Sequence, residues 1–185
     1  MGVSEFQVAI IGSGPAGLSA GARAAARGLS HLVLERSDGP CNTIFRFQKA
    51  KHVMAQPAHA PLRSELPFED GRREDVLAAW HGRAEELGVN LLYNADVIGI
   101  TGVAGAFTIA LADGSEVTAA AVVLAVGLQG NLNTLRVPGA ELEHVGYQLD
   151  DPDEYEHERI SEIGAGDAAI ENALALAAHN DGTII

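Results

Sequence analysis

Residues 6–17 are Phe6-Gln7-Val8-Ala9-Ile10-Ile11-Gly12-Ser13-Gly14-Pro15-Ala16-Gly17. The apolar first half is typical of a parallel strand that is buried on both faces. A glycine-rich turn follows, and the alanine-rich segment 15–27 favours a helix that begins at Pro15 and ends at Gly28. Residues 31–35 form the next apolar run. The pattern therefore predicts a strand, a turn, a helix and a second strand, which make a βαβ unit.

The turn fits the pattern G-x-G-x-x-G. This pattern indicates dinucleotide binding when it follows a strand and opens a helix, as it is predicted to do here. The first glycine permits the tight bend, the second lets a diphosphate approach the backbone, and the third lets the helix pack closely on the strand. Free amides at the helix start can hold a diphosphate without a basic side chain. The predicted dinucleotide site comprises Gly12, Ser13, Gly14, Pro15, Ala16 and Gly17.

Glu35 stands 18 residues after Gly17, at the end of the second predicted strand. A carboxylate at this place can accept hydrogen bonds from both hydroxyls of an adenosine ribose and would repel a 2′-phosphate. We therefore expect Glu35 to bind a ribose, and we include the adjacent Arg36 among the cofactor-binding candidates. The alternative is a structural glycine turn followed by a surface glutamate.

The composition narrows the class of protein. With 185 residues and 47% hydrophobic residues, the chain suits an α/β fold of one domain plus part of another. The formal net charge of -13 argues against non-specific binding to nucleic acid or to an anionic membrane. Cys41 is the only cysteine, which excludes a disulfide framework within the chain and favours the cytoplasm. Neither a signal peptide nor an apolar stretch of about 18 residues is recognisable, so we expect no membrane partner for this segment.

The middle of the chain alternates between irregular and periodic stretches. Residues 36–71 lack clear periodicity and predict a long ordered loop or an excursion with a short helix, and connections of this length are usually functional. Residues 72–87 carry apolar positions at helical spacing, and residues 89–93 predict a third strand. Three stretches alternate between apolar and polar residues, at 97–103, 106–112 and 116–118, and Asp113-Gly114 is a typical hairpin turn. We therefore expect an antiparallel meander. The apolar run 121–126 should then rejoin the parallel sheet.

A second glycine turn, Gly164-Ala165-Gly166-Asp167-Ala168-Ala169, fits the related pattern G-x-G-x-x-A. It follows the segment Ile160-Ser161-Glu162-Ile163 and precedes an alanine-rich helix at 168–179. Two such units imply two dinucleotides, and the candidates at the second are Gly164, Gly166, Asp167 and Ala168. Glu162 is an anomaly, because a charge in a buried strand is costly unless it is paired, so this strand should be short or exposed. The acidic run 150–158 predicts a solvated linker before it.

With both turns, Glu35 and the strand end Ala125-Val126-Gly127, the chain resembles the thioredoxin-reductase-like flavoproteins, which contain two dinucleotide-binding domains. The resemblance covers nearly the whole chain. It implies that the first turn and Glu35 bind the adenosine diphosphate of FAD and that the second turn binds NAD(P)H. It also implies that Val97 meets the adenine through its backbone and that Ala125 and Gly127 pass near the cofactor.

The expected fold class is therefore α/β. A Rossmann-like FAD-binding domain with a parallel sheet and an antiparallel β-meander is assigned to residues 1–127, and a crossover linker to 128–158. An incomplete second dinucleotide-binding βα unit, a partial NAD(P)-binding domain, is assigned to 159–185.

Two departures from the family limit what the resemblance implies. Residues 136–155 lack the Cys-x-x-Cys of thioredoxin reductases, so the closer likeness is to the cysteine-free ferredoxin-NADP reductases and bacillithiol-disulfide-reductase-like proteins. The family's closing segment, which returns to the FAD domain with a Gly-Asp pair, has no room here, although Gly166-Asp167 could imitate it. We therefore expect a piece of a longer protein. Because the residue that contacts the second ribose falls at or beyond Ile185, we expect this chain alone not to complete a nicotinamide-driven cycle.

The predicted function is that of an FAD-dependent pyridine-nucleotide oxidoreductase. Electrons would pass from NAD(P)H through the flavin to an external acceptor, a small molecule or a protein. We assign no catalytic side chain. The alternatives are a non-catalytic nucleotide-binding regulatory module of a larger protein and a single-nucleotide NAD-dependent dehydrogenase, which would leave the second turn unexplained. The acceptor, the choice between NADH and NADPH, and the existence of a homodimer are left open.

Other residues are given no role in chemistry. We expect Cys41 to be an inert small side chain. No metal site is predicted, because the histidines show no metal-ligand spacing: His52, His59, His81, His144, His157 and His179. The locally basic stretch 48–52 is either a solvated loop or a surface that faces the flavin or an acidic partner. Trp80 and Leu87 belong to the apolar stripe of a helix and are expected in the core.

Overall fold

The structure of the chain is a computed structural model in which residues 5–54, 63–128 and 133–184 are described. The chain forms two compact units. The first comprises Met1–Phe45 with His52–Asn131, and the second comprises Arg46–Lys51 with Leu132–Ile185. The short segment 46–51 therefore groups with the second unit, although residues of the first unit flank it on both sides. The functional domain boundaries assigned from the sequence stay a prediction.

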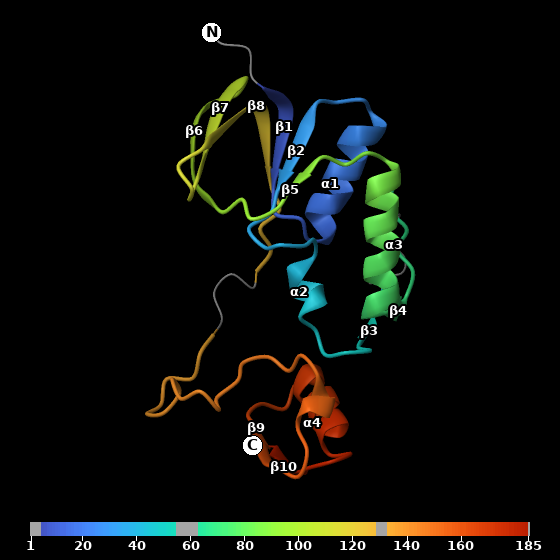
Figure 1. Cartoon of the computed structure of the whole chain (residues 1–185), viewed down its shortest axis with the longest axis vertical. Coiled ribbons are helices and arrows are strands. Elements are labelled where there is room, and N and C mark those ends of the chain that lie inside the picture. The colour runs from blue at the N-terminus through green and yellow to red at the C-terminus, as the bar shows by residue number, and fades with distance from the viewer. Residues whose placement is uncertain (1–4, 55–62, 129–132, 185) are drawn as a thin grey trace. The chain divides into compact units, whose positions relative to one another are not determined.

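The first unit is built on a six-stranded sheet with the strand order β5-β2-β1-β8-β7-β6 (Figure 1). Its elements are β1 (Phe6–Ile11), α1 (Pro15–Ala26), β2 (His31–Leu34), α2 (Asn42–Phe45), β3 (His52–Val53), β4 (Gly71–Arg72), α3 (Arg73–Glu86), β5 (Leu91–Leu92), β6 (Val97–Val103), β7 (Ala106–Leu111) and β8 (Glu116–Leu124). Strand β1 pairs in parallel with both β2 and β8, and β6, β7 and β8 form the antiparallel meander. The predicted α/β fold class is confirmed.

Strand β1 is buried on both faces, as its continuous apolar sequence requires. Successive strand side chains point to opposite faces of a sheet, and both Ala9 and Ile10 are fully buried. Ala9 belongs to a cluster that includes Ile109 and Leu111 of the meander. Helix α1 contacts β1 and β2, and it lies beside α3 (Figure 1). The core therefore surrounds β1 and fixes the turn that follows it.

Strand β8 is one continuous strand where the sequence predicts two, at 116–118 and 121–126. Its first half pairs antiparallel with β7, from Glu116 to Ala119, and its second half pairs parallel with β1 up to Leu124. The sequence pattern changes from alternating to continuously apolar at the place where the partner strand changes, and Val123 and Leu124 in the apolar half are exposed. The prediction of a break in the strand was therefore wrong.

The segment 36–71 contains the short helix α2 and the two-residue strands β3 and β4, which pair antiparallel. Helix α3 confirms the helix predicted at 72–87 and buries Trp80 in the first unit. The Trp80 ring stacks on Phe68 at 5.1 Å, and its Nε1 donates a hydrogen bond to the Pro67 carbonyl at 2.6 Å. The third predicted strand, 89–93, is formed only as β5.

The second unit contains η1 (Pro152–Glu154), β9 (Arg159–Glu162), α4 (Asp167–Leu176) and β10 (Asp181–Ile184). Strands β9 and β10 are parallel, so the unit has a second paired strand where the sequence suggested a strand stub. Glu162 is half-buried at the end of a four-residue strand in a two-stranded sheet, which explains why its charge is tolerated. No helix in the described ranges is long and apolar enough to cross a membrane.

Candidate dinucleotide-binding site

The first glycine turn is closed by backbone on one side and open on the other. Gly12 has a φ of +97°, and a Cβ added there would lie 2.5 Å from the Ala125 carbonyl oxygen. A Cβ at Gly17 would lie 1.8 Å from the Gly12 carbonyl oxygen. A Cβ at Gly14 would meet no described atom within 4 Å. Packing thus requires glycine at the first and third positions, whereas the second leaves the backbone approachable.

Helix α1 starts immediately behind this opening. Gly14 is its N-cap, Pro15 occupies the first turn, and no side chain caps the helix start by a hydrogen bond within the described part of the chain. The first turn contains no acidic residue. The Leu18 amide donates to the Gly14 carbonyl at 2.9 Å, whereas the amides of the first helical turn have no intrahelical acceptor. This end of α1 can therefore hold an anion.

Glu35 follows β2 and holds the turn from the opposite side. Its Oε2 accepts hydrogen bonds from the Ser13 amide at 2.8 Å and the Ser13 Oγ at 2.7 Å. Its Oε1 accepts from the Ser37 amide at 3.0 Å. Burial of the carboxyl raises the pKa of Glu35, but the hydrogen bonds from Ser37 and Ser13 outweigh this effect and leave the pKa below its usual value. The side chain, only 9% exposed, is thus held as a carboxylate beside the turn.

The remaining candidates of the first site come from three neighbouring strand ends. The Ala95 amide donates to the Glu35 carbonyl at 2.8 Å, which places Val97, at the start of β6, near Glu35 in the fold. The Ala125 amide donates to the Ile11 carbonyl at 2.8 Å and so extends the pairing of β8 with β1. Gly127 is exposed with a φ of +66°. Arg36 is also exposed. The backbone hydrogen bonds thus join the segments of Val97 and Ala125 to Glu35 and to the strand before the glycine turn.

Cys41 is a contact of the turn that the sequence did not reveal. Its amide donates to the Ser13 carbonyl at 3.1 Å, and its Sγ donates to the same oxygen at 3.3 Å. The residue adopts a left-handed backbone with a φ of +55°. Burial, together with the charge of Glu35, raises the pKa of the Cys41 thiol to about 12, so the thiol is neutral at physiological pH. The residue thus has a structural role in the turn, and its lack of reactivity stays a prediction.

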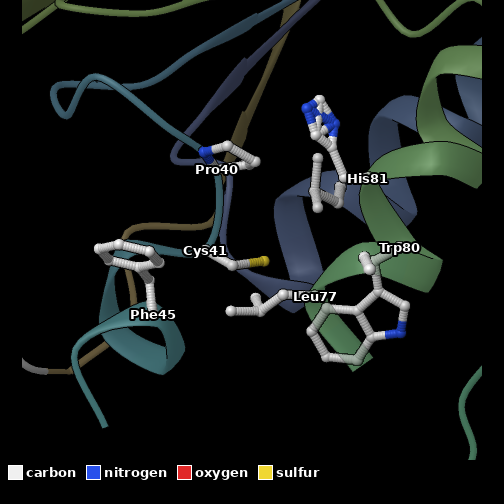
Figure 2. Close-up of a pocket in the computed structure, with 8 residues that line it drawn as sticks. Pro40, Cys41, Phe45, Leu77, Trp80 and His81 are labelled. Atoms are coloured by element: carbon white, nitrogen blue, oxygen red, sulfur yellow. The ribbon is translucent and has the colours of Figure 1, made fainter. Parts of the chain in front are cut away.

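A pocket of about 240 Å³ has Cys41 in its lining (Figure 2). Its lining is almost entirely apolar and comes from α1, α2, α3 and the loop before α2: Leu18, Pro40, Cys41, Phe45, Leu77, Ala78, Trp80 and His81. In Figure 2 the Cys41 sulfur points toward Leu77 and the Trp80 ring. The pocket therefore borders the residue that contacts the glycine turn.

The second glycine turn has a different environment. Gly164 has a φ of +122°, and a Cβ added at Gly164 or Gly166 would meet no described atom within 4 Å. Gly166 is the N-cap of α4, and Asp167 places a carboxylate in the first turn of that helix. Asp167 and Ala168 are both exposed. The four second-site candidates thus lie together on an open turn without a packed strand behind the glycines.

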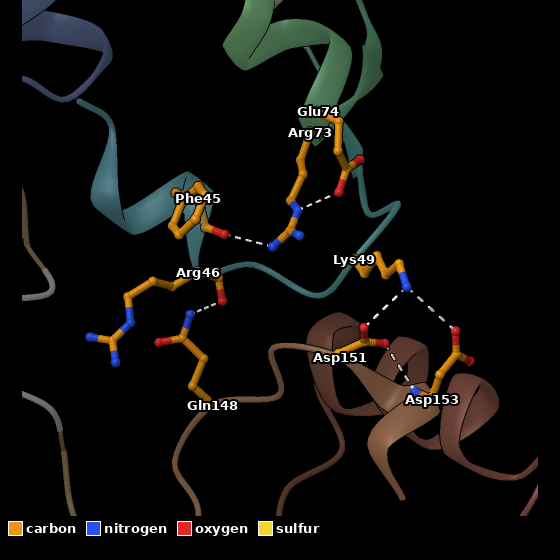
Figure 3. A network of polar contacts seen from close by, with 8 residues as sticks. All are labelled: Phe45, Arg46, Lys49, Arg73, Glu74, Gln148, Asp151 and Asp153. Atoms are coloured by element: carbon orange, nitrogen blue, oxygen red, sulfur yellow. Dashed lines mark hydrogen bonds and ion pairs between the residues drawn. The ribbon is translucent and has the colours of Figure 1, made fainter. Parts of the chain in front are cut away.

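The basic stretch 48–52 is engaged by acids of the second unit. Lys49 Nζ lies 3.1 Å from Asp151 Oδ2 and 3.8 Å from Asp153 Oδ2 (Figure 3). The hydrogen bond to Asp151 and the two negative charges raise the pKa of Lys49. Lys51 pairs with Glu171 of α4. The side chain of Gln148 donates to the Arg46 carbonyl (Figure 3). The two lysines therefore pair with nearby acids, and because Lys49 is exposed these pairs are compatible with a solvated loop.

We found no candidate metal centre among the described residues. In these ranges, no three or more His, Cys, Asp or Glu side chains lie close enough together to hold a metal ion. His59 lies outside those ranges. His31, which sequence patterns did not single out as a candidate, is buried at the start of β2 and contacts Asn90 in the segment before β5. Its Nε2 accepts from the Asn90 amide at 3.1 Å, so its Nδ1 donates to the Leu29 carbonyl at 2.8 Å. This histidine has a structural role.

A strand, a glycine turn, a helix and a strand that ends in a buried acid define a dinucleotide-binding unit. The model of the family described as pyridine nucleotide-disulphide oxidoreductase matches residues 9–184. The chain belongs to this family, and the resemblance noted from the motifs is confirmed.

Two curated relatives share the ferredoxin–NADP reductase name. The protein from Ignicoccus hospitalis is 25% identical over 171 residues, which cover 91% of this chain and 52% of the relative. The protein from Granulibacter bethesdensis is 28% identical over 183 residues, covering 94% of this chain and 49% of the relative. The chain thus spans about half the length of the curated relatives that it matches.

Solved structures show the same fold. Bacillithiol disulfide reductase from Staphylococcus aureus matches with a TM-score of 0.83 and 23% identity, over 98% of this chain and 57% of that one. Thioredoxin reductase from Lactococcus lactis matches with a TM-score of 0.72 and 26% identity, over 97% of this chain and 55% of that one. The arrangement of strands and helices described above is therefore shared with these two reductases.

Proposed function

We propose that the protein is an FAD-dependent oxidoreductase that takes electrons from NAD(P)H and passes them to an external acceptor. The observation that carries the proposal is the buried Glu35, which hydrogen bonds hold beside a glycine turn open at Gly14. Family membership over residues 9–184 supports the same reading of the site.

The residues of the first turn fit the adenosine diphosphate part of FAD. The opening at Gly14 and the acid-free start of α1 suit a diphosphate. Glu35 suits the ribose of FAD, because a carboxylate accepts hydrogen bonds from hydroxyls and repels a 2′-phosphate. Val97 would contact the adenine through its backbone, and Ala125 to Gly127 would pass near the remainder of the cofactor. Bound FAD supplies the redox chemistry, because it accepts a hydride and releases electrons singly or in pairs.

The protein's own contribution is to bind and orient the cofactor. Cys41 is the single cysteine of the sequence, so no dithiol can form within residues 1–185. Its raised pKa, about 12, also disfavours thiolate chemistry. We infer that the electrons leave to a separate molecule. The names of the two curated relatives favour a ferredoxin-type protein acceptor over a small molecule.

The proposal is tested by titrating the purified protein with FAD and following flavin absorbance and fluorescence. We expect saturable binding by the unaltered protein and about tenfold weaker binding by Glu35→Ala, because a hydrogen bond to a charged acceptor is lost. Equal affinity in Glu35→Ala would remove Glu35 from the site. Failure of FAD to bind at any concentration would contradict the proposal for this chain.

Stopped-flow mixing of the FAD-loaded protein with NADH and with NADPH tests the electron donor. Saturable bleaching of the flavin by one of them would identify the donor and show that residues 1–185 suffice. Bleaching by neither would contradict the proposal that residues 1–185 take electrons from NAD(P)H. Thioredoxin reduction by the chain alone, if it persisted in Cys41→Ser, would contradict the assignment of an external acceptor without a dithiol.

A second candidate is a regulatory module that binds one nucleotide and does no chemistry. The open second turn, with a carboxylate at the start of its helix, favours this candidate because such a turn is poorly suited to a second diphosphate. Tight binding of ADP without flavin absorbance in the purified protein would support it against the oxidoreductase.

A further inference from the structure

Ser13 was expected to contact the cofactor, but its side chain is fully buried and committed to another group. Its Oγ and its amide both donate to Glu35 Oε2, at 2.7 and 2.8 Å. Its carbonyl accepts from the amide and the thiol of Cys41, at 3.1 and 3.3 Å. Every polar atom of Ser13 is thus used within the protein. The residue therefore has to act on a ligand through its neighbours.

The contacts of Ser13 hold one oxygen of the Glu35 carboxylate. Both the amide and the hydroxyl of Ser13 donate to Oε2, whereas the Ser37 amide donates to Oε1 and the Ser37 side chain also hydrogen-bonds the carboxylate. Ser13 therefore fixes Oε2 and, with it, the orientation of the carboxylate that a ribose hydroxyl would meet.

The contacts of the Ser13 carbonyl determine the direction of the next amide. In a planar trans peptide the carbonyl and the following N–H point in opposite directions. Because Cys41 holds the Ser13 carbonyl, the Gly14 N–H points away from Cys41. Gly14 is also the position at which the turn is open. An amide fixed in this direction needs no reorganisation when an anion arrives.

We propose that Ser13 is a positioning residue that links the ribose-binding carboxylate of Glu35 to the diphosphate-binding amide of Gly14. Its side chain sets the orientation of Glu35, and its carbonyl, held by Cys41, sets the orientation of the Gly14 N–H. The inference rests on the proposed function for the identity of the ligand. The Ser13 contacts themselves are independent of it.

The experiment compares ADP with its 2′,3′-dideoxy analogue, which retains the diphosphate but has no ribose hydroxyl for Glu35 to bind. Ser13→Ala should weaken ADP binding about fivefold to tenfold and leave the dideoxy analogue unchanged. Cys41→Ala should weaken both ligands equally, about twofold to threefold, because a thiol is a weak donor. Cys41→Ser, which keeps a donor, should restore most of that loss.

Ser19→Ala is the matched control, because Ser19 lies on α1 outside the turn and its hydroxyl pairs with Ser64 at 2.9 Å. It should change the binding of neither ligand. An equal loss of ADP and dideoxy binding in Ser13→Ala would show that Ser13 has only a general structural role. Unchanged ADP binding in Ser13→Ala would also overturn the proposal. Ser13→Cys, with its weaker donor, should fall between Ser13→Ala and the unaltered protein.

A ligand-free measurement separates this inference from the proposed function. The ¹³C chemical shift of the Glu35 carboxyl carbon, followed against pH, should show a higher pKa in Ser13→Ala than in the unaltered protein or Ser19→Ala. The other titratable groups that interact with Glu35 are Cys41 and Tyr93, whose pKa values are both raised, so both are neutral in the acid range. An unshifted titration in Ser13→Ala would overturn the inference even if FAD binds. Absence of ADP binding with a shifted titration would contradict the proposed function alone.

Discussion

At Gly12 an added Cβ would lie 2.5 Å from the Ala125 carbonyl oxygen, whereas at Gly164 it would meet no described atom within 4 Å. The two turns share a sequence pattern and a helix behind it, but only the first is packed against a third strand, β8. Glycine is needed at Gly12 because backbone lies there, and at Gly164 mainly because φ is +122°. A glycine motif therefore predicts the bend of the backbone, whereas the neighbouring strands determine how closely the turn is packed.

The two glycine turns also differ in the charge at the start of the helix that follows each of them. Helix α1 has no acid in its first turn, whereas α4 begins with Asp167. A carboxylate at a helix start interacts favourably with the exposed amides and so competes with a phosphate for them. The start of α1 therefore favours an external anion, whereas the start of α4 already has the negative charge of Asp167.

The register of the strands extends the comparison to the ribose-binding position. In the first unit Ile11 lies opposite Leu34, so Gly12 comes opposite Glu35. In the second unit the described pairing ends with Glu162 opposite Ile184. The described part of the chain therefore contains no residue opposite Gly164 that corresponds to Glu35.

The largest effect should come from adding a methyl group at the third glycine of the first turn. In Gly17→Ala the Cβ would fall 1.8 Å from the Gly12 carbonyl oxygen, which is backbone and cannot move aside cheaply. We expect a loss of about 3 kcal/mol in the free energy of unfolding and the loss of FAD binding. Urea denaturation and FAD titration measure the two effects.

Gly166→Ala is the matched change in the second turn, where the added Cβ would meet no described atom within 4 Å and φ is -80°. We expect it to change the free energy of unfolding by less than about 0.5 kcal/mol. Similar losses in the two variants would show that the packing difference between the turns does not govern their stability.

An intermediate effect should come from Glu35, through the pH dependence of stability. Its pKa is lowered in the folded state, so its contribution is fully present above the unfolded value, near 4.5, and is lost as the pH falls through the lowered folded value. Glu35→Gln should reduce the free energy of unfolding at pH 7 by about 1 to 2 kcal/mol. It should also flatten the dependence of stability on pH below about 4.5.

Glu162→Gln, in the second unit, is the control for this prediction, because Glu162 is half-buried and belongs to a two-stranded sheet. Stability measured by urea denaturation between pH 3 and 7 should be almost the same as in the unaltered protein, with a difference of about 0.5 kcal/mol or less. An acid-range slope that survives in Glu35→Gln would mean that other carboxyl groups dominate.

Sequence patterns predicted most of the first unit and its site because strand, turn, helix and acid are local and regularly spaced. The glycine turn, Glu35 and the meander follow from such spacing. The contact of Cys41 with Ser13 could not be predicted, because it joins residues 28 positions apart through a left-handed backbone in a segment without periodicity. The unbroken course of β8 was also missed, because a strand that changes partners changes its sequence pattern without a break in the backbone.

The smallest effect should come from Asp167, and it tests whether the second turn is limited by its charge. Asp167 stands in the first turn of α4 and is exposed, so its carboxylate lies in water and is screened by salt. In Asp167→Asn the competing charge is removed and the side chain keeps nearly the same size. We expect the affinity for NADH and NADPH to rise about twofold to threefold, because charge interactions with an exposed helix start are worth about 0.3 to 1 kcal/mol.

The measurement is isothermal titration of each dinucleotide at low ionic strength, repeated at high salt, where the gain should shrink. The control is Asp113→Asn in the hairpin turn before β8, where the carboxylate accepts hydrogen bonds from Ser115 and lies at no helix start. Lower affinity in Asp167→Asn would show that the carboxylate itself contacts the dinucleotide, as the motif predicted. In that case the two turns would differ in packing but not in readiness to bind a dinucleotide.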